Sequence, residues 1–87
     1  MHETGLIKGL LHRIEDAAHQ AGSDRVAAID VWLGALSQIS AGHFREHFDQ
    51  ETKGTLAEGA RLSIEESDDP THPSAQSVMI RSIELAM

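Results

Sequence analysis

The sequence predicts a small α+β fold in which two helices pack on a three-stranded mixed sheet, in the order helix, strand, helix, strand, strand. Apolar residues repeat at three-and-four spacing in two segments and alternate with polar residues in three others, the patterns typical of amphipathic helices and half-buried strands. The 87 residues suit one domain, 1–87, whose small core would gain from association with a second copy, so a homodimer is a possible state.

The first predicted helix spans residues 3–21, where apolar side chains share one face. Thr4 is the expected N-cap, and Gly22 is the expected left-handed end. Alternation then predicts a strand from Arg25 that ends near Gly34. Its two faces carry Ala27, Ile29, Val31 and Leu33 on one side and Val26, Ala28, Asp30 and Trp32 on the other. The second face is left open: Trp32 either packs under a helix or is an exposed contact residue.

A second helix is expected from Ser40, as N-cap, to about Thr52, with Phe44 and Phe48 anchoring it to the core. Gly54 ends it.

Two further strands follow the second helix. Ala60, Leu62 and Ile64 alternate with polar residues in the first of them. The last strand runs from about Ser77 to Leu85, and its apolar face changes at Arg81 and Ser82, which predicts a β-bulge. Between these strands lies a segment of residues 66–76, here called the acidic loop, which is rich in Asp, Pro and Ser.

The composition excludes several classes of function. No cysteine is present, so the chain has neither disulfides nor thiolate zinc ligands. Fourteen acidic against seven basic residues, a formal net charge of -7, disfavour nucleic acid as a partner. The apolar runs are far shorter than the roughly 20 residues that span a membrane, so no membrane association and a cytosolic location are expected. Six histidines are many for so short a chain, so imidazole is its most over-represented metal donor, which is a compositional hint only.

The sequence resembles the HypA/HybF family of nickel chaperones over nearly its whole length. The matching pieces are Met1-His2-Glu3, Leu6-Ile7, Val31-Trp32-Leu33-Gly34 with Leu36-Ser37, the run 53–62 (Lys-Gly-Thr-Leu-Ala-Glu-Gly-Ala-Arg-Leu), and Ser82-Ile83-Glu84. Each piece is short, but their order and spacing agree with the family throughout. The resemblance implies a nickel-binding accessory protein for maturation of a nickel enzyme, most often [NiFe]-hydrogenase, with a HypB-type GTPase and the hydrogenase large subunit as partners and no enzymatic activity.

The sequence departs from that family in two places. Family members carry a zinc ribbon built from two CxxC pairs between the second and third strands, whereas this chain has the acidic loop there, so no zinc is expected. Thr4-Gly5 also stands where the family usually has an apolar residue followed by Ser.

The chemistry of a metal site at Met1-His2-Glu3 follows from the donors themselves. The α-amine, the His2 amide nitrogen and the His2 δ nitrogen form adjacent chelate rings, and a nearly planar set of nitrogen donors suits Ni(II) or Cu(II). The fourth position is open, and the resemblance implies that the Glu3 amide or a partner fills it. The competing interpretation is that His2 is an ordinary polar residue at a chain end, and that the chain is a metal-free interaction module.

The other histidines support weaker hypotheses. His43 to His47 reads H-x-x-E-H, a metallopeptidase pattern, but so small a chain would struggle to supply the third ligand and the cleft. As a pair, His43 and His47 are either a secondary metal or interface site or ordinary helix residues. His12 and His19 are expected on the outer side of the first helix. His72, with Asp68 and Asp69, either binds a cation weakly or lies in a solvated loop.

Overall fold

The computed structural model describes the backbone of residues 3–86 and the side chains of residues 5–86. The elements follow the predicted order. They are α1 (Glu3–Gln20), β1 (Val26–Leu33), α2 (Ala41–Glu51), β2 (Arg61–Glu66) and β3 (Val78–Leu85). No helix within the described residues is long and apolar enough to cross a membrane.

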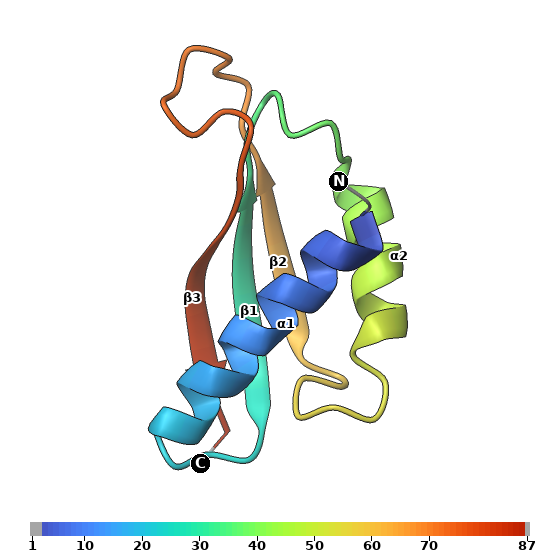
Figure 1. Cartoon of the computed structure of the whole chain (residues 1–87), viewed down its shortest axis with the longest axis vertical. Coiled ribbons are helices and arrows are strands. Elements are labelled where there is room, and N and C mark those ends of the chain that lie inside the picture. Colours follow the sequence, from blue (N-terminus) through green and yellow to red (C-terminus); the bar gives the residue numbers. More distant parts are fainter. Residues whose placement is uncertain (1–2, 87) are drawn as a thin grey trace.

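The three strands form one mixed sheet in the order β2-β1-β3, with β2 parallel and β3 antiparallel to β1. Figure 1 shows both helices on the same face of this sheet, where α1 crosses the strands obliquely and α2 lies beside β2. The second face is not covered by a helix and is called the open face below. The predicted fold class is therefore confirmed.

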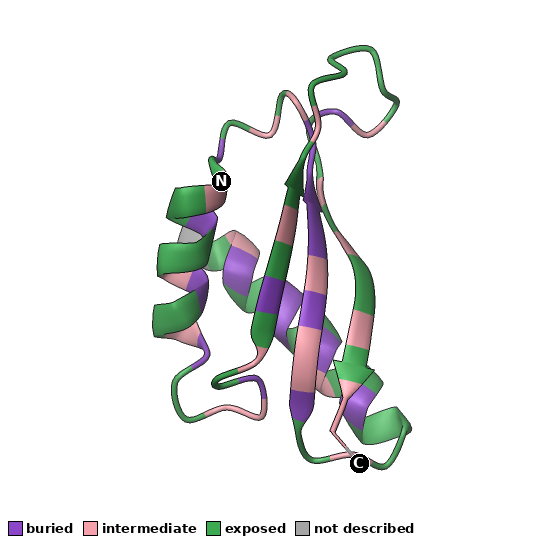
Figure 2. Cartoon of the chain, turned by 180° about the vertical axis from the view of Figure 1, so that it is seen from behind, coloured by how far each residue is buried: buried purple, intermediate pink, exposed green. Residues whose placement is uncertain are grey.

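The core lies between the helices and the sheet. From the opposite side of the molecule, Figure 2 shows buried residues along β1 and on the inner sides of both helices. The apolar positions predicted for α1 supply Ile7, Leu10, Leu11, Ile14 and Ala18 to this core. In α2 the predicted pair Phe44 and Phe48 is buried, and the two rings stack with their centroids 5.9 Å apart.

Two bulges shift the pairing of β1 with β3. Ser82 pairs with Asp30 and Ile80 with Val31, so Arg81 is the extra residue, as the change of face predicted. The second shift lies between Val26 and Ala28, and it places Val26 in the core cluster. The assignment of Val26 to the open face was therefore wrong, because the extra residue reverses the alternation at the start of β1.

Local signals define most helix ends. Ser40 caps α2 by accepting the His43 N–H at 3.2 Å, and Gly22 and Gly54 adopt positive φ after the two helices. The expectation for Thr4 was wrong. Helix α1 already begins at Glu3, and an N-cap residue lies outside the helical turn that it caps.

Candidate functional site

The predicted metal ligands lie at the start of α1. Met1 and His2 are outside the described residues, and Glu3 is described only through its backbone, as the first residue of α1. The nickel site therefore stays a prediction from the sequence.

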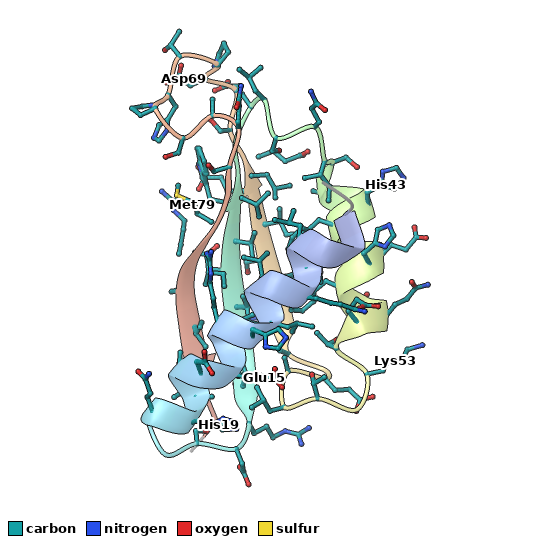
Figure 3. The ribbon with its side chains drawn as sticks, in the orientation of Figure 1. Glu15, His19, His43, Lys53, Asp69 and Met79 are labelled. Carbon is teal, nitrogen blue, oxygen red and sulfur yellow. The ribbon has the colours of Figure 1, made fainter. Side chains whose placement is uncertain are left out.

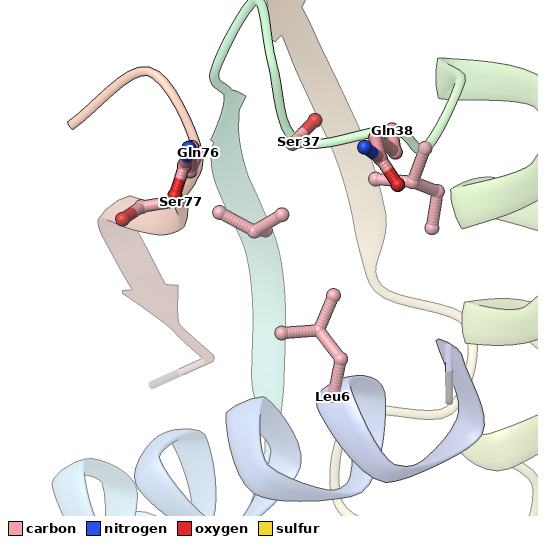
Figure 4. Close-up of a pocket in the computed structure, with 7 residues that line it drawn as sticks. Leu6, Ser37, Gln38, Gln76 and Ser77 are labelled. Atoms are coloured by element: carbon pink, nitrogen blue, oxygen red, sulfur yellow. The ribbon is translucent and has the colours of Figure 1, made fainter. Parts of the chain in front are cut away.

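A groove opens one helical turn after Glu3. It is a cavity of about 530 Å³ between the start of α1, the β1–α2 connection and the segment that precedes β3 (Figure 4). Its lining combines apolar Leu6, Ile39 and Val78 with polar Ser37, Gln38, Gln76 and Ser77. No acidic or basic side chain lines it, so the groove can bind apolar groups and donate hydrogen bonds but offers no acid–base pair.

This groove could not be predicted from the sequence, because its walls come from three segments that are distant along the chain. One residue that lines the groove has an unusual backbone conformation. Gln38 has φ 63°, and within the described residues it is the one non-glycine residue with positive φ. Left-handed backbone costs roughly 1–2 kcal/mol for such a residue.

The histidine pair of α2 is not assembled into a metal centre. His43 is exposed in the first turn of α2, where Figure 3 shows its ring directed away from the sheet, and His47 is half-buried. Within residues 5–86 no three histidine or carboxylate side chains are placed to hold a metal ion. The H-x-x-E-H pattern therefore has no third ligand in this part of the chain. His12 and His19 are exposed on α1, as predicted.

The acidic loop reaches the open face of the sheet through His72. Its His72 ring packs on the Trp32 ring, with the centroids 4.9 Å apart, and Trp32 is only 5% exposed. Neither alternative for Trp32 was right, because the residue is covered by this loop and not by a helix. A segment distant in sequence supplies the cover, so the pattern within the strand could not indicate it.

Hydrogen bonds within the acidic loop hold Asp69 ionised. The Thr71 hydroxyl donates to Asp69 Oδ1 at 2.6 Å, and the Thr71 N–H donates to the same oxygen at 3.0 Å. These bonds favour the carboxylate, so they lower the pKa of Asp69 below its usual value, with a smaller contribution from His72. Of the two alternatives for His72, the cation site with Asp68 and Asp69 is not assembled within the described residues, and the exposed positions of these three side chains agree with a solvated loop.

Backbone contacts fix both ends of the acidic loop. The Ser67 N–H donates to the Leu33 carbonyl at 2.9 Å, and beyond β1 the Gly34 and Leu36 N–H groups donate to the Ser77 and Ala75 carbonyls at 2.9 and 2.8 Å. At Gly34 the two segments are so close that a Cβ atom would lie 2.1 Å from the Ala75 carbonyl oxygen. The loop therefore closes over the end of the sheet at which β1 and β2 finish.

Comparison with known proteins identifies the class. The family model described as hydrogenase/urease nickel incorporation, metallochaperone, hypA matches residues 1–72. The chain therefore belongs to the HypA family, as the sequence resemblance indicated.

Individual relatives agree with this assignment. The chain is 39% identical over 64 residues to hydrogenase maturation factor HypA of Acidithiobacillus ferrooxidans, in an alignment that covers 74% of this chain and 57% of that protein. It is 42% identical over 65 residues to the protein of the same name from Methylocella silvestris, covering 75% and 58% of the two chains. The chain thus spans less than three fifths of the length of these curated relatives.

A structural comparison extends the likeness to β3. The solution structure of the Ni metallochaperone HypA from Helicobacter pylori matches with a TM-score of 0.81 at 16% sequence identity, covering 98% of this chain and 97% of the other. At this identity the match supports the fold alone. It includes the last strand, which lies beyond the family match.

Proposed function

We propose that the chain is a non-enzymatic, cytosolic nickel carrier for maturation of a nickel enzyme, with [NiFe]-hydrogenase as the favoured client. The observation that carries this proposal is the family match over residues 1–72, because it includes Met1-His2-Glu3. The relatives bear the name hydrogenase maturation factor, which gives the client class.

The proposed site uses the donors at the chain start, with nickel as cargo. The α-amine of Met1, the His2 amide nitrogen and the His2 δ nitrogen form three corners of a planar set, and Glu3 or a partner supplies the fourth. An incomplete set of protein ligands suits a carrier, because an incoming ligand can replace the outgoing one. Copper binds such donors more tightly than nickel, so selectivity comes from supply and delivery.

The proposal extends to the partners and the acidic loop. By resemblance, the carrier serves a HypB-type GTPase and a hydrogenase large subunit. The acidic loop stands in place of the family's zinc ribbon within a single domain, and the absence of cysteine removes the thiolate ligands of such a ribbon. Delivery therefore takes place without a zinc site.

Nickel titration of the untagged chain, with Met1 retained and unblocked, tests the proposal. Calorimetry at pH 7.5 is expected to give one Ni(II) per chain, and His2→Ala is expected to weaken binding at least about a hundredfold because it removes a ring donor. The affinity should fall as the pH drops from 8 to 6, since protons compete for the amine and the imidazole.

His12→Ala is the matched control, since this exposed imidazole lies outside the proposed site. It should bind nickel as the unaltered chain does. The alternative function is a metal-free protein–protein interaction module. Absence of one-to-one binding, or unchanged binding after His2→Ala, would favour that module.

A further inference from the structure

Strand β3 leaves one side of its backbone unpaired. The strand order β2-β1-β3 places it at an edge of the sheet, and Figure 1 shows no element beside its outer side. Within the described residues, β1 is its only hydrogen-bonded neighbour in the sheet. An edge of this kind presents a row of N–H and C=O groups that can pair with another strand.

The backbone groups that point away from β1 belong to four apolar residues. The Gly34 N–H donates to the Ser77 carbonyl before β3, and the Ala86 N–H donates to the Arg25 carbonyl after it. Backbone direction alternates along an antiparallel strand, and the extra residue Arg81 separates the two halves of β3. Alternation from both ends gives the outward-directed residues as Val78, Ile80, Ile83 and Leu85.

The side chains of the same four residues lie on the helix side of the sheet and are only half-buried. The residues that pair with them on β1 are at most 2% exposed; they are Leu33, Val31, Ile29 and Val26. The difference arises because β1 has a strand on both sides and β3 has a strand on one. A strand added beyond β3 would therefore cover apolar surface and enlarge a small core.

The faces of β3 read the same in both directions. Ser82 lies on the open face because it pairs with Asp30, and Arg81 lies there because its guanidinium contacts Glu65, the β2 neighbour of Trp32. The eight residues therefore face the helices, open, helices, open, open, helices, open, helices.

Two antiparallel copies of β3 match at all eight positions in one register alone, with Arg81 opposite Ser82 of the second copy. The other pairs, each formed twice about a two-fold axis, are Ile80 with Ile83, Val78 with Leu85, and Met79 with Glu84. The four residues with outward backbone groups thereby pair with one another, so each such pair exchanges two hydrogen bonds.

Charges on the open face favour the same register. Arg81 lies diagonally across from Glu84 of the second copy, a separation that long side chains span. Glu84 lies opposite Met79, so the two copies place no carboxylates directly against each other. The two Arg81 side chains flank the axis, where each keeps Glu65 of its own chain as a partner.

We propose that the chain forms a symmetric dimer through β3, in which two three-stranded sheets join into one continuous sheet with Arg81 opposite Ser82. The contact uses none of the proposed nickel donors, so its failure would leave the nickel proposal intact.

Sedimentation of the unaltered, metal-free chain measures the association, and a monomer–dimer equilibrium is expected between about 5 and 500 μM. Hydrogen exchange locates the contact. The Ile80 and Ile83 amides should exchange at least about tenfold more slowly at the highest concentration than at the lowest. The Ser82 and Glu84 amides, which are directed toward β1, should not change.

Cysteine cross-linking tests the register, because the chain has no cysteine. Met79 and Glu84 are exposed, and as a non-hydrogen-bonded pair their Cα atoms would lie about 4.5 Å apart, within the range of a disulfide. The double variant Met79→Cys, Glu84→Cys should oxidise to a covalent dimer at least about fivefold faster than either single variant. In each single variant the two thiols would lie about 16 Å apart along the paired strands.

Arg81→Glu tests the charges. It places a carboxylate diagonally across from Glu84 of the second copy, so the dissociation constant should rise at least about tenfold. Lys53→Glu is the matched control, since it makes the same change in net charge far from β3 (Figure 3) and should have a much smaller effect.

Three outcomes would overturn the proposal. A monomer at every concentration would show that the bulge and Arg81 protect this edge. A dimer whose Ile80 and Ile83 amides exchange as fast as in the monomer, or equal cross-linking of the double and single variants, would place the contact on another surface.

Discussion

At the residue scale, Gly34 is required by close packing between two segments. We expect Gly34→Ala to lower the free energy of unfolding by about 2 kcal/mol or more, because its Cβ would lie 2.1 Å from the Ala75 carbonyl oxygen, which belongs to backbone that cannot simply turn away. Urea unfolding followed by helix circular dichroism measures the change.

Gly9→Ala is the matched control for this substitution. Gly9 lies inside α1, and a Cβ atom there would meet no atom within 4 Å, so the change should raise stability by roughly 0.5–1 kcal/mol through helix propensity. Equal effects of the two substitutions would show that the contact with Ala75 carries no cost.

At the element scale, two side chains satisfy the first N–H groups of α2. Ser40 Oγ accepts from the His43 N–H at 3.2 Å, and Glu66 Oε2, from the end of β2, accepts from the Ala41 N–H at 3.1 Å. The second contact ties the helix start to the sheet. Arg45 adds another tie by donating to the Leu62 carbonyl on β2 at 2.9 Å.

Ser40→Ala should cost about 1 kcal/mol of stability, the usual value of an N-cap. Thermal unfolding measures the loss. Ser40→Asp should restore stability, because aspartate caps as well as serine does and its charge is favourable at a helix N-terminus. If Ser40→Asp is as destabilised as Ser40→Ala, capping is not the cause.

The face of a strand on which each residue lies could be predicted from the sequence wherever a polar residue interrupted the apolar alternation. The bulge at Arg81 was visible because polar Arg81 and Ser82 interrupt an apolar alternation. The bulge at the start of β1 was not, because Ala27 and Ala28 are both small and apolar, and neither marks a face.

At the scale of the whole molecule, one core joins both helices to the sheet. Phe44 is fully buried in it and stacks on Phe48, so Phe44→Ala should lower the free energy of unfolding by about 3–5 kcal/mol. A domain of this size has only about 5–15 kcal/mol in total, so the variant should unfold at much lower urea concentration.

Phe44→Leu provides the comparison, since it keeps most of the apolar volume and should lose less. Trp32 emission and circular dichroism should change together in each variant, because the chain has a single core. A loss below about 1 kcal/mol for Phe44→Ala would contradict the central role of this ring.

The candidate nickel site depended almost wholly on the sequence, because its donors are consecutive residues. Chelation by the amine, amide and imidazole of Met1-His2 requires no distant segment, so spacing along the chain is enough to propose it. The groove beside Leu6 required the folded chain, because Gln38 and Val78 reach it from other elements.

The sequence by itself determined the order of helices and strands and most of the residues that build the core, since these depend on short-range periodicity and local capping. The family followed from the resemblance of short segments that match it in order and spacing. Only the tertiary structure decided that Trp32 lies under the acidic loop and that His72 covers it. Such contacts join residues 40 positions apart, as Trp32 and His72 are, and chain periodicity carries no information about which distant segment will cover an open face.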